Sequence, residues 1–267
     1  MKYHIYTPLR LGAKDDQVTQ LQRSLPIWTA PEPLVADGIF GSKTEDAVKA
    51  YQSAMELPVD GVVGRVTASA LGVWADVEKG FDASHWQKIS WGDFEREDLD
   101  FAIFKATQGT SFVDPDFSRN VSEAVNVGLD VGAYHFADLD FTPFEEAANF
   151  CRAVDERPIT SAFLDLESVS LKPNFDYREW VGLWLDIVRA ALPNCVEVGV
   201  YTSSRYLREI SEQDFGYLRN FKLWGVNWSR QPLIVPWESW DCWQYTSKGQ
   251  ITGIDGNVDL NLRVKRG

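Results

Sequence analysis

Short apolar segments of strand length alternate with amphipathic segments of helical period along most of this chain. The strand candidates are residues 80–82, 101–106, 131–136, 162–167, 196–201, 222–226 and 241–245. One predicted helix begins at Thr142, where Pro143 and Glu145 are typical first-turn residues, and places Phe144, Ala147, Cys151 and Val154 on one face. A second carries Trp180 and Trp184. Strands that alternate with helices pair in parallel beneath them, so the pattern predicts an α/β barrel. About 190 residues are few for a full eight-fold barrel, and some late strands are expected to lack helices.

One strand candidate ends in two carboxylates. Residues 161–166 are mostly apolar, and Asp165 is followed two positions later by Glu167. Side chains two apart on a strand point to the same face about 6.5 Å apart, so both would project from one strand end. Such a pair suits acid/base cleavage of a glycosidic bond. A strand that simply runs into an acidic turn is the alternative interpretation of these two residues alone.

Further polar clusters lie at other strand ends, at residues 82–87, 134–136, 243–246 and 253–261. Functional side chains of a parallel barrel gather where its strands end, so these clusters are expected near the paired carboxylates. His85 and His135 fall within the first two. We predict that both histidines are hydrogen-bonded supports rather than proton carriers.

The beginning of the chain contains an internal repeat. Asp37-Gly-Ile-Phe-Gly is followed by Thr44, and Asp60-Gly-Val-Val-Gly is followed by Thr67. Each Asp-Gly pair predicts a turn, and residues 42–45 have the spacing of a capping box with Ser42 as the cap. Helical faces are predicted from Val18, Leu21, Gln22 and Leu25, and from Ala47, Val48, Tyr51 and Met55. The segment therefore predicts a small all-α helical bundle.

Composition and charge argue against several classes of function. The net charge of −13 falls mostly after residue 75, and such an acidic surface repels phosphate backbones, so no nucleic-acid partner is expected. Cys151, Cys195 and Cys242 lie far apart and are predicted to be buried thiols. With three histidines and no H-E-x-x-H motif, we expect neither a metal site nor a cofactor.

Residues 1–16 contain no apolar segment of signal-peptide length, and no later run approaches the length of a membrane span. We therefore expect the chain to stay in the cytoplasm where it is made until something else releases it, without membrane insertion. No feature points to an obligate oligomer, and a monomer is expected.

Residues 8–72 resemble the peptidoglycan-binding domain found at the ends of many cell-wall hydrolases. The resemblance rests on the two Asp-Gly repeats with their threonines, on Leu21-Gln22 before the first, on Tyr51-Gln52 before the second, and on Leu71. A helical domain of unrelated function with two similar turns is the alternative.

Residues 79 to about 262 resemble glycoside hydrolase family 25, the muramidases often called Chalaropsis-type lysozymes. In sequence order, the motifs that carry the resemblance are the clusters at 82–87 and 134–136, Asp165-Leu-Glu, Val200-Tyr-Thr, and the clusters at 243–246 and 253–261. The resemblance implies an irregular TIM-like β/α barrel.

It also implies roles for individual residues. Glu167 aligns with the family's general acid and Asp165 with its partner carboxylate, while Asp82 and Asp259 align with other acidic residues of the catalytic groove. The substrate-binding candidates are Tyr134, Phe136, Tyr201, Trp224, Trp243 and Gln244. Trp86 and Trp228 are further groove candidates, because flat rings can stack on sugar faces. Helix capping or ion pairing remains an alternative for Asp82 and Asp259.

Carboxylates packed at one groove floor cannot all ionise freely, so the most enclosed is expected to have a raised pKa. A protonated Glu167 would be a competent general acid. If Asp165 orients the 2-acetamido group of the sugar, that group attacks the anomeric carbon and configuration is retained; if Asp165 activates water, configuration is inverted. The close spacing expected of same-face carboxylates favours the first route.

These resemblances predict a peptidoglycan-binding helical domain over residues 1–73, a linker over 74–79 and a catalytic barrel over 80–267. The expected activity is that of an N-acetylmuramidase on bacterial peptidoglycan, cleaving the β-1,4 bond between N-acetylmuramic acid and N-acetylglucosamine. A wall-binding module without an export signal is typical of a bacteriophage endolysin, with a bacterial autolysin as the competing origin. Two further interpretations of the chain are a chitinase-like glycosidase and a catalytically inactive wall-binding protein.

Overall fold

The computed structural model describes residues 4–167, 175–193, 196–209, 216–232 and 234–265 of the 267-residue chain. The chain forms two compact units. One contains the residues up to Val77 together with the chain end from Val264, and the other contains Glu78–Arg263. Each is described here by itself.

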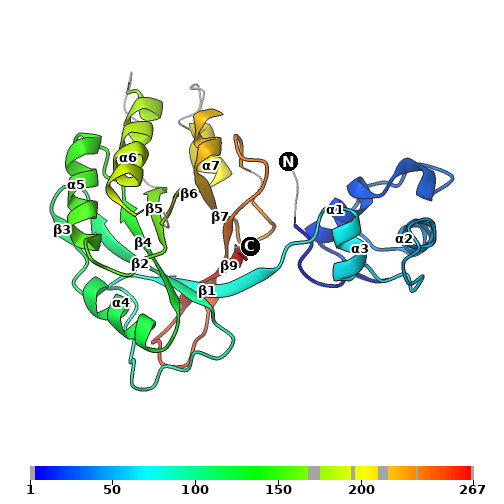
Figure 1. The fold of residues 1–267 in the computed structure, drawn as a ribbon, viewed down its shortest axis with the longest axis horizontal. Coiled ribbons are helices and arrows are strands. Elements are labelled where there is room, and N and C mark those ends of the chain that lie inside the picture. The colour runs from blue at the N-terminus through cyan, green and yellow to red at the C-terminus, as the bar shows by residue number, and fades with distance from the viewer. Residues whose placement is uncertain (1–3, 168–174, 194–195, 210–215, 233, 266–267) are drawn as a thin grey trace. The chain divides into compact units, whose positions relative to one another are not determined.

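The first unit is a small helical bundle, as the sequence predicts. It contains α1 (Asp16–Ser24), a short 3₁₀ helix η1 (Ile27–Thr29), α2 (Ser42–Ala54) and α3 (Arg65–Ala70) (Figure 1). The carboxylate of Asp15 caps α1 by accepting a hydrogen bond from the N–H of Val18 at 3.0 Å. The predicted cap at Ser42 is wrong, because Gly41 occupies the N-cap position of α2 and Ser42 is already helical. Met55, predicted to face the core, is 47% exposed because it lies at the C-cap.

A buried glutamine organises the first Asp-Gly turn of this unit. Nε2 of Gln22 donates to Oδ1 of Asp37 at 2.9 Å, to the carbonyl of Ile39 at 3.1 Å and to Oγ1 of Thr44 at 3.2 Å. Oε1 of Gln22 accepts from the N–H of Gly38 at 3.0 Å. Gly38 adopts φ +76°, a conformation that glycine reaches without strain. One amide therefore ties the turn to helices α1 and α2.

The second repeat builds the same arrangement around Gln52. Its Nε2 donates to Asp60 at 2.8 Å, to the carbonyl of Val62 at 3.0 Å and to Thr67 at 3.2 Å, and its Oε1 accepts from the N–H of Gly61 at 3.0 Å. Gly61 has φ +73°. Each copy of the sequence repeat therefore forms the same hydrogen-bond network, in which a buried glutamine amide pairs with the polar groups of an Asp-Gly turn.

The segment predicted as a linker is largely structured. Trp74 forms an isolated β-bridge with Ile5 and packs against the core of the first unit, and the N–H of Ala75 donates to the carbonyl of Ile5 at 2.9 Å. Strand β1 already begins at Val77. Residues 74 and 75 therefore contact the first unit, and residues 77–79 lie in β1.

The second unit is a closed barrel. Its strands are β1 (Val77–Ala83), β2 (Phe101–Gln108), β3 (Phe112–Val113), β4 (Asp130–Phe136), β5 (Ser161–Leu166), β6 (Glu197–Thr202), β7 (Lys222–Val226), β8 (Cys242–Gly249) and β9 (Val258–Val264). The sheet order is β1-β9-β8-β7-β6-β5-β4-β2-β3, and pairing of β1 with β2 closes it. Because β3 is paired only to β2, the other eight strands form the barrel wall.

Most strands are parallel and alternate with helices, which confirms the predicted α/β barrel. Helices α4 (Phe117–Asn126), α5 (Pro143–Val154), α6 (Tyr177–Ala191) and α7 (Ser204–Glu209) and the 3₁₀ helix η2 (Gly216–Asn220) lie between the strands in sequence and outside them in space (Figure 1). As predicted, the late strands differ: no helix separates β7 from β8 in the described residues, and β8 pairs antiparallel to β9. Strands β3 and β9 are not among the predicted ones.

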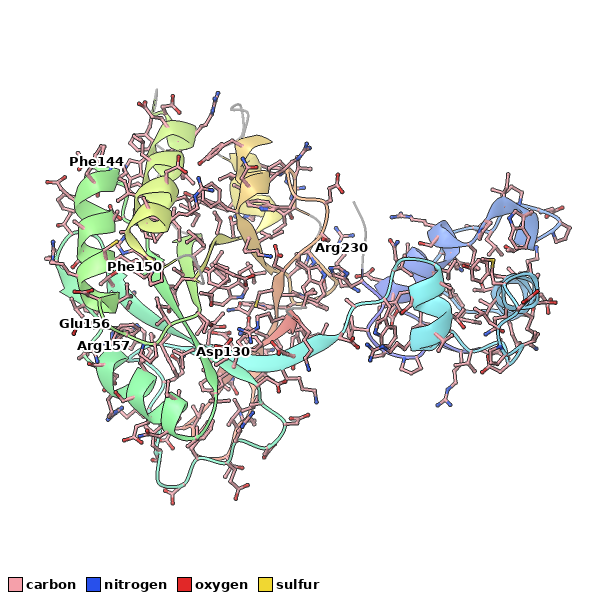
Figure 2. All side chains as sticks on the ribbon, viewed as in Figure 1. Asp130, Phe144, Phe150, Glu156, Arg157 and Arg230 are labelled. Atoms are coloured by element: carbon pink, nitrogen blue, oxygen red, sulfur yellow. The ribbon has the colours of Figure 1, made fainter. Side chains whose placement is uncertain are left out.

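Helix α5 begins with the predicted capping box of Thr142 and Glu145. Its buried face differs from the prediction, since Phe144 is 59% exposed whereas Phe150 is fully buried. Figure 2 labels both side chains. The polar residues Glu146 and Asn149 are buried on the barrel side, and they turn the inward face away from Phe144. Hydrophobic periodicity cannot identify a buried face that contains polar anchors.

The end of the barrel where the parallel strands begin is closed by an ion-pair network. Arg263 contacts Glu78 at 2.6 Å and Asp130 at 2.7 Å, and its guanidinium lies over the ring of Phe101 at 4.3 Å. Asp130, at the start of β4, is labelled in Figure 2. Above it, aromatic and aliphatic side chains fill the interior: Phe101, Ile103, Phe163, Tyr201, Trp224 and Cys242. The opposite end is where polar groups gather.

Candidate active site

Four carboxylates gather at the end of the barrel where the parallel strands finish. Asp82 lies near the end of β1 and Asp165 near the end of β5, and Glu167 follows β5 directly. Asp259 lies at the start of β9, which belongs to the same end because β9 runs antiparallel to β8. The four sequence-predicted acidic residues influence one another's ionisation, so the barrel brings them together.

Asp82 is 6% exposed and is held by two side-chain amides. Its Oδ2 accepts hydrogen bonds from Nε2 of Gln244 at 3.0 Å and from Nδ2 of Asn261 at 2.7 Å. Burial raises the pKa of Asp82 well above its usual range and repulsion from Asp259 raises it further, while the two amide hydrogen bonds act in the opposite direction. Among the described residues Asp82 forms no salt bridge and caps no helix, so neither of those interpretations applies to it.

Asp165 is equally buried, at 6% exposure, but lacks such support. Its Oδ1 has no hydrogen-bond partner among the residues that the structure describes. Burial raises the pKa of Asp165 well above its usual range, repulsion from Glu167 adds to the increase, and the ammonium of Lys105 opposes it. A buried acceptor left without a donor is available to a group that comes from outside the protein.

Glu167 is exposed and can therefore reach a bound molecule. The surrounding protein nevertheless raises the pKa of its carboxyl by desolvation, although a hydrogen bond with Tyr201 and the charge of Lys105 lower it. Burial, followed by repulsion from Glu167, raises the pKa of Asp259 to about 6. The site thus holds carboxyls of unequal proton affinity, which is what paired acid and base roles require.

Aromatic rings form the floor beneath the carboxylates. The ring of Trp224 meets Tyr201 at 4.5 Å, Phe163 at 5.3 Å and Tyr134 at 6.0 Å between centroids. Burial raises the pKa of Tyr134 and that of Tyr201 well above the usual value, so both phenols remain protonated. Trp224, predicted to bind substrate, is only 2% exposed, and its ring lies within this aromatic floor.

The remaining substrate-binding candidates differ in accessibility. Trp243 is 9% exposed, and its Nε1 donates to the carbonyl of Asn227 at 2.8 Å. Gln244 is 4% exposed, with its amide engaged by protein groups on both sides. Phe136 is half-buried at the end of β4, and the ammonium of Lys105 lies 4.8 Å from its ring centroid.

Two exposed tryptophans follow the ends of strands at the carboxylate end. Trp86, after β1, is 78% exposed, and Trp228, after β7, is 61% exposed. The indole of Trp228 donates to Oε1 of Gln244 at 3.3 Å, which places it beside the carboxylate network. Exposed indoles at such positions offer flat apolar faces to a sugar.

Sequence reasoning missed two polar residues of the site. Lys105 is 8% exposed, donates to Gln108 at 2.8 Å and influences both Asp165 and Glu167. Its signal is a charged residue inside the otherwise apolar strand 101–106. Asn261 stands at the end of the motif at residues 253–261, but nothing in that motif indicates that its amide meets Asp82.

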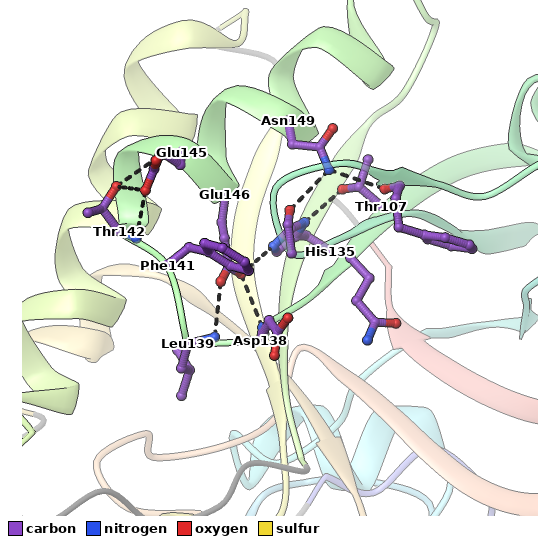
Figure 3. A network of polar contacts seen from close by, with 12 residues as sticks. Thr107, His135, Asp138, Leu139, Phe141, Thr142, Glu145, Glu146 and Asn149 are labelled. Atoms are coloured by element: carbon purple, nitrogen blue, oxygen red, sulfur yellow. Dashed lines mark hydrogen bonds and ion pairs between the residues drawn. The ribbon is translucent and has the colours of Figure 1, made fainter.

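A second polar network lies on the outer side of β4 (Figure 3). The ring of His135 contacts Thr107 Oγ1 at 2.7 Å and Glu146 Oε2 at 2.8 Å. Burial lowers the pKa of His135, although the hydrogen bond with Glu146 opposes the decrease, so the imidazole is neutral. Glu146 also accepts from the backbone N–H groups of Asp138 at 3.1 Å and Leu139 at 3.0 Å. His135 is therefore a hydrogen-bonded support, as the sequence predicts.

Asn149, one turn further along α5, anchors the turn between β2 and β3. Its Nδ2 donates to the carbonyls of Gly109 at 3.0 Å and Phe112 at 3.1 Å. Asp114 directly follows β3, and its Oδ2 lies 2.7 Å from Nδ1 of His85. His85 is thus also hydrogen-bonded, and helix α5 fixes loops that border the carboxylate end of the barrel.

Other features of the described residues take no part in the hydrogen bonds of this site. Cys242 is a buried free thiol and Cys151 a half-buried one, while Cys195 lies outside the described residues. No group of three His, Cys, Asp or Glu side chains among the described residues could hold a metal ion. Cavities of about 250 and 420 Å³ flank Lys222 where β7 begins, at the opposite end of the barrel. No helix in the described part of the chain is both long and apolar enough to span a bilayer.

Comparison with known families gives one match for each unit. Residues 81–254 match the family described as glycosyl hydrolases family 25. Residues 14–71 match the family described as putative peptidoglycan binding domain. The first match includes Asp82, Asp165 and Glu167. The second includes Gln22 and Gln52 together with the turns that they hold.

Individual relatives agree with the larger match. The chain is 26% identical over 203 residues to a lysozyme of Streptomyces globisporus, an alignment that covers 68% of this chain and 66%, about two thirds, of that relative. Among solved structures it is similar to the bacterial lysozyme of Streptomyces coelicolor, with 25% identity, TM-score 0.60, and coverage of 71% of this chain and 93% of the other. It is also similar to the catalytic domain of an endolysin from a bacteriophage of Listeria monocytogenes, with 25% identity, TM-score 0.58, and coverage of 71% and 93%.

Proposed function

This chain belongs to glycosyl hydrolase family 25, and from that membership we propose that it is a peptidoglycan hydrolase of the muramidase type. The bond it cleaves in this proposal is the β-1,4 link from N-acetylmuramic acid to N-acetylglucosamine. The observation that carries the proposal is the group of buried and half-buried carboxylates around Asp165 and Glu167, at the end of the barrel where strands finish. The likeness to lysozymes supports the choice of substrate.

In the proposed mechanism Glu167 is the general acid. Desolvation raises its pKa, which favours the protonated form that a general acid needs, and its exposure lets the carboxyl reach the glycosidic oxygen. Protonation of that oxygen accompanies breakage of its bond to the anomeric carbon. Positive charge then develops on the sugar, and the acidic surroundings stabilise it.

We assign Asp165 to the acetamido group of the same sugar. Its Oδ1, which has no donor among the described residues, is suited to accept a hydrogen bond from the acetamido N–H. That contact would orient the acetamido oxygen to bond to the anomeric carbon as the leaving group departs. Water would then displace the acetamido oxygen from the anomeric carbon while Glu167 takes a proton from that water, so that the acetamido group is regenerated with net retention of configuration.

Asp82 and Asp259 complete the proposed catalytic groove, with Tyr134, Phe136, Tyr201 and Trp243 beside them. Burial and repulsion from neighbouring carboxylates raise the pKa of Asp82 and that of Asp259, the latter to about 6. A groove that retains protons suits a reaction that begins with proton donation.

We further propose that residues 1–73 bind peptidoglycan and that residues 80–267 contain the catalytic barrel. Tethering a weak wall-binding unit to the enzyme raises the effective concentration of the barrel at an insoluble polymer. The family match over residues 14–71 supports this division. A monomer is sufficient for such an arrangement.

The likeness to a bacteriophage endolysin supports a role in host lysis as the finer form of the proposal. In that role the protein would accumulate in the host cytoplasm and reach the wall only after the membrane is opened. Recovery of the protein outside intact producing cells would instead indicate an autolysin.

Product analysis tests the activity. Purified peptidoglycan is digested with the full chain, and the new sugar ends are reduced with borohydride and identified by mass spectrometry, with Glu167→Gln as the inactive control. New reducing N-acetylmuramic acid is the expected result. New reducing N-acetylglucosamine, or lysis by the control at the parental rate, would overturn the assignment. Cleavage of chitin oligosaccharides at equal rate would favour a chitinase-like enzyme.

The stereochemical route is tested separately. Proton NMR of the first-formed anomer from a short glycan substrate is expected to show the β anomer, which is retention. An initial α product would assign Asp165 to activation of water instead.

A further inference from the structure

The hydrogen bonds of Asp82 extend through two amides into the aromatic floor. Nε1 of Trp224 donates to Oδ1 of Asn261 at 2.8 Å, and Nδ2 of Asn261 donates to Oδ2 of Asp82 at 2.7 Å. On the other side, Oε1 of Gln244 accepts from Nε1 of Trp228 at 3.3 Å and lies 3.2 Å from the hydroxyl of Tyr201, and Nε2 of Gln244 donates to the same oxygen of Asp82 at 3.0 Å. Two separate chains of donors therefore converge on one carboxylate oxygen.

The orientation of each amide is determined by its other partner. An indole N–H can only donate, so the oxygen of Asn261 must face Trp224 and its NH₂ must face Asp82. The exposed indole of Trp228 donates to Oε1 of Gln244 at 3.3 Å and fixes the second amide in the same way. Turning either amide over would place a donor against a donor and an acceptor against a carboxylate.

The convergence also distinguishes the two oxygens of Asp82. A carboxylate oxygen has two lone pairs, and on Oδ2 the two amides occupy both. A proton bound by Asp82 must therefore reside on Oδ1. Amide donors favour the charged form of a carboxyl, so they oppose the burial and the like charges that favour protonation.

We propose that Asn261 and Gln244 are positioning residues that hold Oδ2 of Asp82 and turn Oδ1 toward the substrate groove. Trp224 and Trp228 orient the two amides. The catalytic consequence rests on the proposed function, whereas the orientation of Asp82 rests on the hydrogen bonds alone. Gln244, predicted from the sequence to bind substrate, acts in this proposal through Asp82.

The groups that surround Asp82 make this restraint necessary. The titratable neighbours on the strands around it, and directly after β5, are Asp259, Glu167, Asp165, Tyr134, Tyr201 and Cys242. All of these are neutral or negative, and the ammonium of Lys105 acts on Asp165 and Glu167. Within the described residues, the two amides are the groups that favour the ionised form of Asp82.

The direct test is titration of Asp82 in the full chain by NMR of ¹³C-labelled aspartate carboxyls, with the signal assigned by its loss in Asp82→Asn. Asn261→Ala is expected to raise the pKa of Asp82 by roughly 1 unit, the value of one lost hydrogen bond to a charged group. Gln244→Met, which removes the other donor at similar volume, is expected to shift it in the same direction. Trp224→Phe should give a smaller shift, because Asn261 keeps its NH₂ but loses the group that orients it.

Trp240→Phe is the matched control. Trp240 is also buried, and its indole also donates to a glutamine oxygen, that of Gln231, at 2.8 Å. This hydrogen bond involves neither of the two amides that hold Asp82, so the variant should leave the titration unchanged. An Asp82 titration that is unchanged in folded Asn261→Ala and Gln244→Met would overturn the proposal, as would an equal shift in Trp240→Phe.

A kinetic readout separates positioning from structural support. The pH profile of kcat/KM on peptidoglycan fragments should move with the titration of Asp82 in Asn261→Ala, while KM at the optimum changes little. A uniform loss of activity with an unshifted profile would contradict a positioning role. Because the NMR titration needs no substrate, an inactive parent would refute the proposed function and leave the orientation of Asp82 to be decided by the titration.

Discussion

Two buried carboxylates lie on opposite sides of the barrel wall, and among the described residues only one of them is fully hydrogen-bonded. Glu146 reaches the outer side of β4 from α5, is fully buried, and accepts from His135 and from the backbone N–H groups of Asp138 and Leu139 (Figure 3). Asp165 lies on the neighbouring strand β5 and is 6% exposed. Its Oδ1 finds no donor in the part of the chain that the structure describes.

The comparison shows that burial alone does not separate structural from functional acids. A buried carboxylate with a full set of donors stabilises the fold by fixing the loops that supply them. A buried carboxylate that lacks donors destabilises the fold. Such a group is typical of a functional site, where a substrate is expected to supply the missing hydrogen bond. We therefore expect Glu146, on the outer side of the barrel wall, to determine stability and Asp165, on the inner side, to determine activity.

Asp165→Asn gives the largest expected effect. Loss of the carboxylate should lower kcat on peptidoglycan by roughly 10²–10³-fold, the range for removal of one group that stabilises the transition state by a hydrogen bond. The free energy of unfolding should stay level or rise, because the change removes an ionisable group that the fold does not satisfy. Turnover and chemical denaturation of the same preparation measure both quantities. If the variant lost stability in proportion to its loss of activity, Asp165 would have a structural role, and the distinction between Asp165 and Glu146 would be wrong.

Glu146→Ala should show the opposite pattern. It leaves the imidazole of His135 and two backbone N–H groups buried without an acceptor. Because each unpaired buried donor costs about 1–3 kcal/mol, we expect the free energy of unfolding to fall by about 3 kcal/mol or more. Glu145→Ala, an adjacent exposed position of the capping box, should cost only about 1 kcal/mol. If Glu146→Ala does not fold, Glu146→Gln provides a milder version of the same change. Stability equal to that of the parent in both would contradict the structural role of Glu146.

The first unit extends the comparison to a neutral group. Gln52 is 1% exposed and fully hydrogen-bonded, so Gln52→Ala should destabilise the unit by about 1–3 kcal/mol through the unpaired groups of its turn. Ser53→Ala, exposed on the same helix, is the control and should be nearly neutral. Hydrogen exchange of the amides in α2 and α3 measures the effect locally. Exchange in β4 and β5 is expected to remain at the parental rate, and acceleration there would show that the two units do not unfold independently.

The smallest effect concerns the pH dependence of stability. The pKa of Asp259 is raised from 3.8 to about 6, so its stabilising contribution is complete below the ordinary value and is lost as the pH rises through about 6. Asp259→Asn should therefore reduce the decrease in unfolding free energy between about pH 4 and 6. Urea denaturation at intervals across this range measures the slope. Asp255→Asn, an exposed position before the same strand, should retain the parental slope; equal slopes for both variants would contradict the assignment.

Much of the fold could be predicted because its signals are local. The alternation of strands and helices, the capping box at Thr142 and the paired turns at Asp37 and Asp60 depend on residues close together in the chain. The errors arise where polar groups are buried. Buried Glu146 and Asn149 turn the inward face of α5 away from Phe144. Hydrophobic periodicity does not predict this face, because both residues are polar.

The candidate site likewise contains some residues that the sequence could identify and some that it could not. Asp165 and Glu167 could be identified together because a strand repeats its face every second residue, which is a property of the local backbone. Their meeting with Asp82 and Asp259 depends on closure of the barrel through the pairing of β1 with β2 and β9. The amide of Asn261 reaches Asp82 across 179 positions of sequence, a separation that no local pattern encodes.

The sequence by itself therefore determined the class of fold, the repeated turns of the first unit and the acidic pair on β5, since each follows from backbone geometry and short-range side-chain chemistry. Tertiary structure alone decided which carboxylates receive donors, which tryptophans lie beneath the site and which reach solvent, and where Lys105 places its charge. Those properties depend on desolvation and on contacts between distant segments, and both exist only once the barrel has closed.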